Sequence, residues 1–102
     1  SDKQSFGAIY YIKTPDNSQP LPVGQWNQVR ILVNGSHIEH WVNGRKVIDA
    51  DRSSPEFAQW IAASKFKHLD KFGTFSKGHI ALQDHNSEVW FRNIKIRELN
   101  GP

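Results

Sequence analysis

The chain has 102 residues, of which 37% are hydrophobic and 23% are charged, and its formal net charge is +3. These proportions are typical of one globular domain, and they exclude a disordered chain and a two-domain protein. No run approaches the roughly 18 apolar residues of a membrane span, and the first residues lack the plan of a signal peptide, so we expect a soluble domain. The absence of cysteine excludes a disulfide framework, a thiolate metal site and a cysteine nucleophile.

The positive charge does not indicate a nucleic-acid partner, because basic and acidic residues are mixed along the chain. Arg45 and Lys46, for example, are soon followed by Asp49 and Asp51. The most basic stretch, residues 65–77, contains three phenylalanines and superficially resembles a base-stacking surface. A solvated loop that packs its phenylalanines on the core explains it better, so we expect no nucleic-acid binding.

The N-terminal part predicts one strand and one loop. Residues 6–12 are rich in aromatic and β-branched side chains, which favour a strand. Residues 14–22 contain three prolines and predict a loop.

Residues 25–50 predict a three-stranded antiparallel meander. Apolar and polar residues alternate there, and the runs end at Asn34-Gly35 and Asn43-Gly44, the strongest short hairpin signal. A two-residue loop at Asn34-Gly35 places Arg30 opposite Glu39, which predicts a cross-strand ion pair. The alternation then divides the side chains between an apolar face (Val29, Ile31, Val33, Ile38, Val42) and an amphipathic face (Arg30, Leu32, His37, Glu39, Trp41).

Residues 53–64 predict a short amphipathic helix on the rim of the sheet. A serine cap and Pro55 mark its start, and Phe57, Trp60 and Ile61 share one face. Two further strands are expected at residues 79–83 and 88–99, joined by a turn at residues 84–87. The apolar parity of the last strand changes midway, which predicts a bulge near Arg92-Asn93.

Several residues of the meander are candidates for sugar binding. Trp41 offers an aromatic surface for the apolar face of a sugar ring, although it could equally pack in the core or beneath the helix. His40 falls on the apolar face, where a hydrogen-bonded core histidine is the simpler interpretation. Asn43 is better explained as a turn former than as a ligand. Pairing with Arg30 would keep Glu39 ionised and structural, because an opposite charge lowers a carboxyl pKa.

Asp84 and His85 form the strongest catalytic candidate. A turn at the end of a strand often presents reactive groups, and a neighbouring carboxylate raises the basicity of an imidazole. The alternative is that both side chains only make turn hydrogen bonds. No metal site is predicted, because His37 and His40 project to opposite faces of one strand. No nucleophile-elbow motif accompanies the histidines, and Asp49 and Asp51 alone do not define a glycosidase carboxylate pair.

Four stretches together resemble the family of 3-keto-disaccharide hydrolases and 3-keto-glucoside lyase/hydratases, formerly a domain of unknown function. They read GAIYYI, PVGQWNQVRI, IEHWVNG and GHIALQDHNSEVWFRNIKIREL, and the last is the most specific. The resemblance implies an all-β fold, a concanavalin A-like jelly-roll β-sandwich with one short helix, of which residues 1–102 would form a single unit corresponding to the C-terminal half. About six strands are expected here, so an N-terminal half or another chain would have to cover an open sheet edge.

The resemblance also implies a function. It favours a hydrolase or lyase acting on glycosides oxidised at C3, with His85 and Asp84 as catalytic residues and Trp41, Glu39, Arg30, Asn43 and His40 as substrate-binding residues. It implies a carbohydrate partner, no cofactor and an extracellular or periplasmic location. The alternative is a carbohydrate-binding module without catalytic activity.

Overall fold

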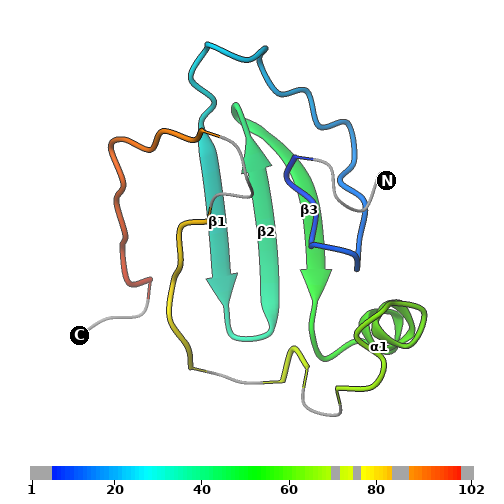
Figure 1. Cartoon of the computed structure of the whole chain (residues 1–102). Coiled ribbons are helices and arrows are strands. Elements are labelled where there is room, and N and C mark those ends of the chain that lie inside the picture. Colours follow the sequence, from blue (N-terminus) through cyan, green and yellow to red (C-terminus); the bar gives the residue numbers. More distant parts are fainter. Residues whose placement is uncertain (1–5, 70–71, 75–76, 84–87, 100–102) are drawn as a thin grey trace.

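The computed structural model describes residues 6–69, 72–74, 77–83 and 88–99. Its elements in chain order are β1 (Val29–Asn34), β2 (His37–Val42), β3 (Arg45–Asp51) and α1 (Pro55–Ala62). The strands form one antiparallel sheet in the order β1-β2-β3, and α1 lies beside the end of β3 (Figure 1). The predicted meander and short helix are thus confirmed. In the part of the chain that the structure describes, no helix has the length and apolar character to cross a membrane.

The two hairpins use different turns. Asn43 and Gly44 both have positive φ, +51° and +81°, as a type I′ turn requires. In the first hairpin, Asn34 already pairs with His37, so the loop is Gly35-Ser36. Gly35 has a φ of +60°, which fits a type II′ turn with glycine at its first central position.

The shifted loop corrects the predicted register of the first hairpin. Every residue of β1 pairs two positions further along β2 than expected, so Arg30 lies opposite Trp41 and Glu39 lies opposite Leu32. The predicted Arg30–Glu39 pair is therefore wrong. Because side chains alternate with a period of two, a shift of two leaves every residue on its predicted face.

A β-bulge interrupts the second hairpin. His40 pairs with Ile48 and Trp41 pairs with Lys46, so Val47 is an extra residue in β3. Val47 and Ile48 are consecutive and both almost fully buried. The carbonyl of Val47 accepts a hydrogen bond of 2.7 Å from the backbone N–H of Asp16, which satisfies a polar group at the irregularity.

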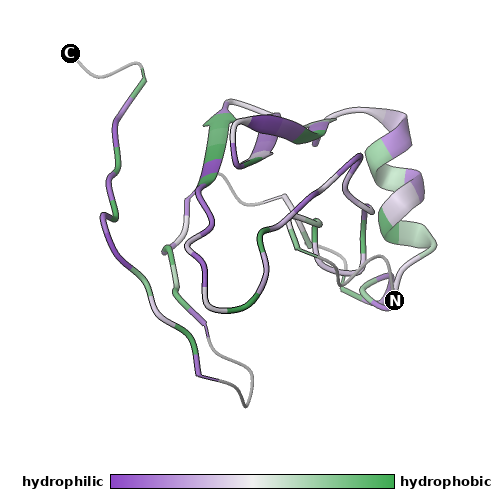
Figure 2. Ribbon diagram, turned by 90° about the horizontal axis from the view of Figure 1, so that it is seen from above, coloured by the Kyte–Doolittle hydropathy of each residue, from purple (hydrophilic) through white to green (hydrophobic). Residues whose placement is uncertain are grey.

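The hydrophobic core lies on one side of the sheet, between β2, β3, α1 and the N-terminal segment. Figure 2 shows α1 and the N-terminal segment on the same side of the sheet. Phe66 and Phe72 stack with their ring centroids 4.4 Å apart and pack against the core, as predicted, while Phe75 lies outside the described residues. The buried apolar residues are Ile12, Val42, Val47, Ile48, Ala50 and Phe57.

The end of β3 leads into α1 through a capped turn. The Asp51 carboxylate accepts hydrogen bonds from the hydroxyl and the backbone N–H of Ser53, at 2.6 Å and 2.8 Å. These bonds lower the pKa of Asp51 to about 2. Ser54 is the N-cap, and its hydroxyl accepts from the N–H of Phe57 at 3.1 Å. The cap fixes the start of the helix so that Phe57 enters the core.

Three predicted strands are not formed. Residues 6–12 make turns, with positive φ at Gly7 and Tyr11 and a single bridge between Ile9 and Lys13. Residues 79–83 and 88–99 carry no strand either. A strand needs a partner for its backbone hydrogen bonds, and β-forming composition alone does not supply one. The predicted bulge is therefore absent, although Asn93 has a φ of +55° where the parity changes.

The apolar face continues onto β1 without being covered there. Figures 1 and 2 both place residues 88–99 beyond β1, far from α1. Val29, Ile31 and Val33 are 51%, 62% and 55% exposed, although they share a face with the buried Val42. The described part of the chain thus leaves the β1 part of this face uncovered.

The turn geometry gives a test of the fold. Gly44→Val should lower the free energy of unfolding by about 1 to 3 kcal/mol, because a β-branched residue tolerates a φ of +81° poorly. No atom lies within 4 Å of the added Cβ, so the loss would come from the backbone alone. Gly78→Val is the matched control, since Gly78 also has open space but lacks a positive φ. Urea unfolding should separate the two variants, and equal stabilities would contradict the turn.

Candidate functional site: the polar face of the sheet

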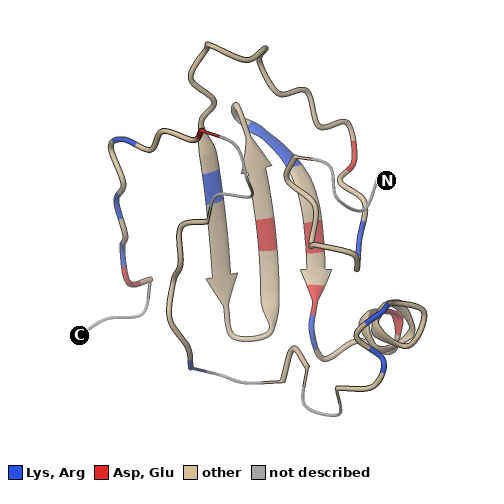
Figure 3. Cartoon of the chain, in the orientation of Figure 1, with Lys and Arg blue, Asp and Glu red and all other residues tan. Residues whose placement is uncertain are grey.

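The face of the sheet opposite the core presents a connected group of polar and aromatic side chains. His37, Glu39 and Trp41 alternate along β2 and therefore point to the same side. Asp49 of β3 lies directly opposite Glu39, so acidic residues of neighbouring strands meet in the middle of the sheet (Figure 3). We refer to His37, Glu39, Trp41, Lys46 and Asp49 as the polar cluster.

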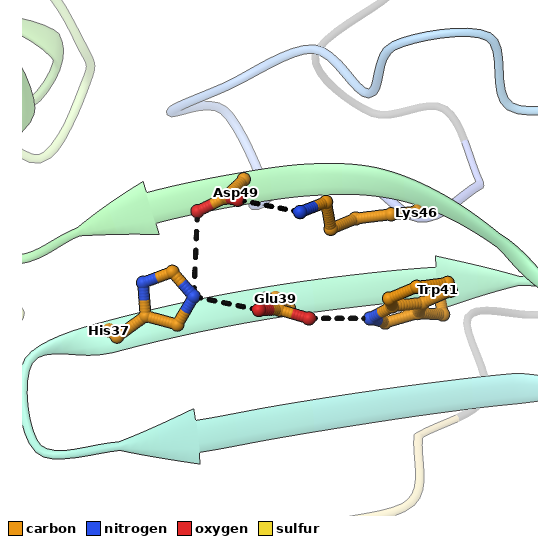
Figure 4. Close-up of polar contacts among 5 residues, drawn as sticks. All are labelled: His37, Glu39, Trp41, Lys46 and Asp49. Atoms are coloured by element: carbon orange, nitrogen blue, oxygen red, sulfur yellow. Dashed lines mark hydrogen bonds and ion pairs between the residues drawn. The ribbon is translucent and has the colours of Figure 1, made fainter.

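Glu39 lies at the centre of the polar cluster (Figure 4). His37 Nε2 is 2.8 Å from Glu39 Oε2, and the indole N–H of Trp41 donates to Glu39 Oε1 at 2.8 Å. These two hydrogen bonds, the one from His37 first, lower the pKa of Glu39 below its ordinary value. The carboxylate is therefore ionised at neutral pH and is held at both oxygens.

Asp49 forms the second anionic position of the polar cluster. Its Oδ2 accepts a hydrogen bond of 2.8 Å from the Lys46 ammonium, and its Oδ1 is 3.5 Å from His37 Nε2. The bond from Lys46 lowers the pKa of Asp49 and raises the pKa of Lys46. One imidazole nitrogen thus faces two carboxylates from two strands.

Trp41 connects the polar cluster to β1. It is neither in the core nor beneath α1, because its indole N–H reaches Glu39 on the polar face. The Arg30 guanidinium lies 5.6 Å from the Trp41 ring centroid, within the range of a cation–π interaction. Arg30, Glu39 and Trp41, three predicted substrate-binding residues, are therefore brought together.

His40 and Asn43 do not join this group. His40 lies on the opposite face, where its Nδ1–H donates to the carbonyl of Gly7 at 2.8 Å. Asn43 is a turn residue whose Oδ1 accepts from the N–H of Gln28 at 2.8 Å. Its amide also donates to Asn27 Oδ1 at 3.0 Å, which attaches the preceding loop to the turn. Both side chains have structural contacts, as the simpler sequence interpretation held.

Asp84 and His85, the predicted catalytic residues, lie outside the described residues. Their assignment stays a prediction, and so does the predicted turn at residues 84–87.

Sequence reasoning missed His37, Lys46 and Asp49 as members of the site. Without a bulge, the Asn43-Gly44 loop would place Asp49 opposite Ile38, on the core face. The structure instead pairs Asp49 with Glu39, because Val47 is an extra residue in the strand. A usable signal was present in the sequence: two adjacent apolar residues, Val47 and Ile48, interrupt an alternation that resumes at Asp49.

The chemistry open to the polar cluster follows from its donors and acceptors. The Nε2 atom of His37 lies within reach of both carboxylates, 2.8 Å from Glu39 Oε2 and 3.5 Å from Asp49 Oδ1. The Trp41 ring and the Arg30 guanidinium can pack against and hydrogen-bond a polyhydroxylated ligand. A nitrogen and two carboxylate oxygens in one place are also potential metal ligands, and His37, Glu39 and Asp49 present these atoms within 4.8 Å of one another.

A family model described as the 3-keto-alpha-glucoside-1,2-lyase-like domain matches residues 1–97. The chain belongs to this family. The match covers almost the whole sequence and confirms the resemblance seen in its motifs.

Relatives of this lyase-like domain are found among curated proteins and solved structures. A 3-keto-disaccharide hydrolase of Bacteroides thetaiotaomicron is 31% identical over an alignment of 97 residues, and the match covers 84% of the chain and 32% of that protein. The crystal structure of a protein assigned as a glycosyl hydrolase from Parabacteroides distasonis matches with a TM-score of 0.66 and 27% identity. That match covers 72% of the chain and 33% of the solved chain. The lyase-like chain thus spans about a third of the length of either relative.

The hydrogen bonds of Glu39 predict how its ionisation responds to mutation. In His37→Ala the pKa of Glu39 should rise toward its ordinary value, because the largest cause of its lowering is removed. Trp41→Phe, which removes only the N–H donor, should raise this pKa by a smaller amount. Titration of the Glu39 carboxyl carbon by NMR measures both changes. An unchanged Glu39 pKa in His37→Ala would show that the central contact of the polar cluster is absent in solution.

Proposed function

We propose that the protein cleaves glycosides whose glucose unit carries a ketone at C3. The observation that carries this proposal is the family match over residues 1–97. The similarity to a 3-keto-disaccharide hydrolase supports the same substrate class. The polar cluster adds an aromatic ring and charged hydrogen-bonding groups on one accessible face.

The chemistry of such a substrate needs a base and an acid. The C3 ketone acidifies the hydrogen on C2, so a base that removes this proton generates an enolate. The enolate electrons then form a double bond between C2 and C1 as the bond from C1 to the glycosidic oxygen breaks. The leaving oxygen takes a proton from an acid. If water then adds across the new double bond, the net reaction is a hydrolysis. If the unsaturated sugar is released instead, the enzyme acts as a lyase.

We assign the base to His85, assisted by Asp84, and sugar binding to the polar cluster. The position of the two residues within the LQDH motif supports the assignment, since this is the most family-specific stretch. Trp41 would pack on the apolar face of the sugar ring, and Arg30 beside it would hydrogen-bond ring oxygens. Glu39, held at both oxygens, would fix the orientation of Trp41.

We further propose that the sheet is part of a larger β-sandwich of the jelly-roll type. The exposed row Val29, Ile31 and Val33 supports this, because a second layer would bury it. The extracellular or periplasmic location implied by the family stays a prediction.

A non-catalytic carbohydrate-binding module is the second candidate. The packing of Arg30 against Trp41 favours it, because an aromatic surface with an adjacent hydrogen-bond donor binds sugars without any reactive group. Incubation with a 3-keto-disaccharide and chromatographic analysis of products separates the two functions. Product formation supports the enzyme, and saturable binding without product supports the module.

The catalytic assignment predicts a large loss of turnover in His85→Ala, by about a hundredfold or more, as is usual for a general acid or base. Asp84→Asn should have a smaller effect that depends on pH, because it removes the charge that tunes the imidazole. His68→Ala, at an exposed histidine, is the matched control and should retain turnover. Melting curves accompany each variant. Full turnover in His85→Ala, or a loss explained by unfolding, would remove His85 from the mechanism.

A further inference from the structure

Three metal-binding atoms converge on the polar face from two adjacent strands. His37 Nε2 lies 2.8 Å from Glu39 Oε2 and 3.5 Å from Asp49 Oδ1, and all three lie within 4.8 Å of one another. Ligand atoms around a tetrahedral zinc ion are about 3.4 Å apart, since Zn–N and Zn–O distances are about 2.0 to 2.2 Å. We propose that His37, Glu39 and Asp49 bind a divalent transition-metal ion such as Zn²⁺ or Mn²⁺.

The neighbouring side chains orient these ligands. The Trp41 indole N–H holds Glu39 Oε1, and the Lys46 ammonium holds Asp49 Oδ2, each at 2.8 Å. Each carboxylate therefore turns its other oxygen toward His37 (Figure 4). Side chains that hold metal ligands in this way raise the affinity of the site for the metal, because the ligands lose less freedom of motion when the metal binds.

The composition of the cluster favours particular ions. One imidazole and two carboxylates suit zinc, manganese or iron better than calcium, which prefers an all-oxygen shell. Two carboxylate charges, partly balanced by Lys46, leave the three ligands with a net negative charge that attracts a cation. Binding would replace the hydrogen bond between His37 and Glu39 by two bonds to the metal.

The ligands can be reached from solvent. The side chains of His37, Glu39 and Asp49 are 41%, 18% and 49% exposed. Three protein ligands leave at least one coordination position open, the arrangement of catalytic rather than structural zinc sites. An ion there would lie next to Trp41 and could bind sugar oxygens. This role rests on the proposed function, whereas the proposal of metal binding does not depend on it.

Calorimetric titration of the untagged, metal-free protein with ZnCl₂ and with MnCl₂ tests the site. We expect one saturable site for at least one of the two ions. His37→Ala and Asp49→Asn should each weaken metal binding by about tenfold to a hundredfold or more. Trp41→Phe should weaken it by about tenfold. Glu56→Gln, at an exposed carboxylate of α1, is the control and should bind like the wild type.

The metal titration contains no sugar, so its result does not depend on whether the protein cleaves glycosides. Circular dichroism confirms that each variant folds, and Asp49→Asn, which preserves shape, decides the result if His37→Ala does not fold. Absence of saturable binding would show that the polar cluster is an ion-pair network only. Binding that persists undiminished in both variants would assign the metal to other residues, and either result overturns the proposal.

Discussion

One extra residue in β3, Val47, determines which side chains of that strand face the core and which face the polar surface. Because side chains alternate along a strand, an insertion of one residue exchanges the two faces for every residue beyond it. Val47 and Ile48 both enter the core as a result, and Asp49 turns toward Glu39 and His37. Burying one such aliphatic side chain contributes about 1.5 to 3 kcal/mol, so the core itself stabilises the bulge.

The core and the polar cluster are therefore two consequences of the same irregularity. On one side, Val47 and Ile48 pack with Val42, Ile12 and Phe57 beneath the N-terminal segment and α1. On the other side, His37 is hydrogen-bonded to Glu39, Lys46 is hydrogen-bonded to Asp49, and His37 lies 3.5 Å from Asp49. Neither set of contacts would survive a regular strand, since Asp49 would then be directed into the apolar layer.

Local turn chemistry explains why part of this architecture could be read from the sequence. Asn43-Gly44 forms the predicted turn because both residues tolerate positive φ. The first hairpin turns one residue later than predicted, at Gly35-Ser36, yet each face keeps its members because the pairing shifts by an even number. The bulge was not predicted, although Val47 and Ile48 interrupt the alternation, and without it Asp49 was expected to face the core.

The two predicted C-terminal strands failed because a strand needs a neighbouring strand to pair with, whatever its composition. Residues 79–83 and 88–99 alternate like strands, but no neighbouring strand supplies their hydrogen bonds in the described part of the chain. The row formed by Val29, Ile31 and Val33 is exposed for a related reason, because no second layer covers it there. Membership of the lyase-like family was readable from the motifs, whereas the placement of Asp84 and His85 lies outside the described residues.

We propose that the protein binds its sugar on the polar face of the sheet, at Trp41. Titration of ¹⁵N-labelled protein with a 3-keto-disaccharide, observed at the indole N–H signals of the tryptophans, tests it most directly. A saturable shift of the Trp41 signal is expected, because its N–H donates to Glu39 at the proposed binding surface. The signal of Trp60, which packs against the core from α1, should stay in place. A shift confined to Trp60, with Trp41 unchanged at saturation, would contradict sugar binding at the polar face.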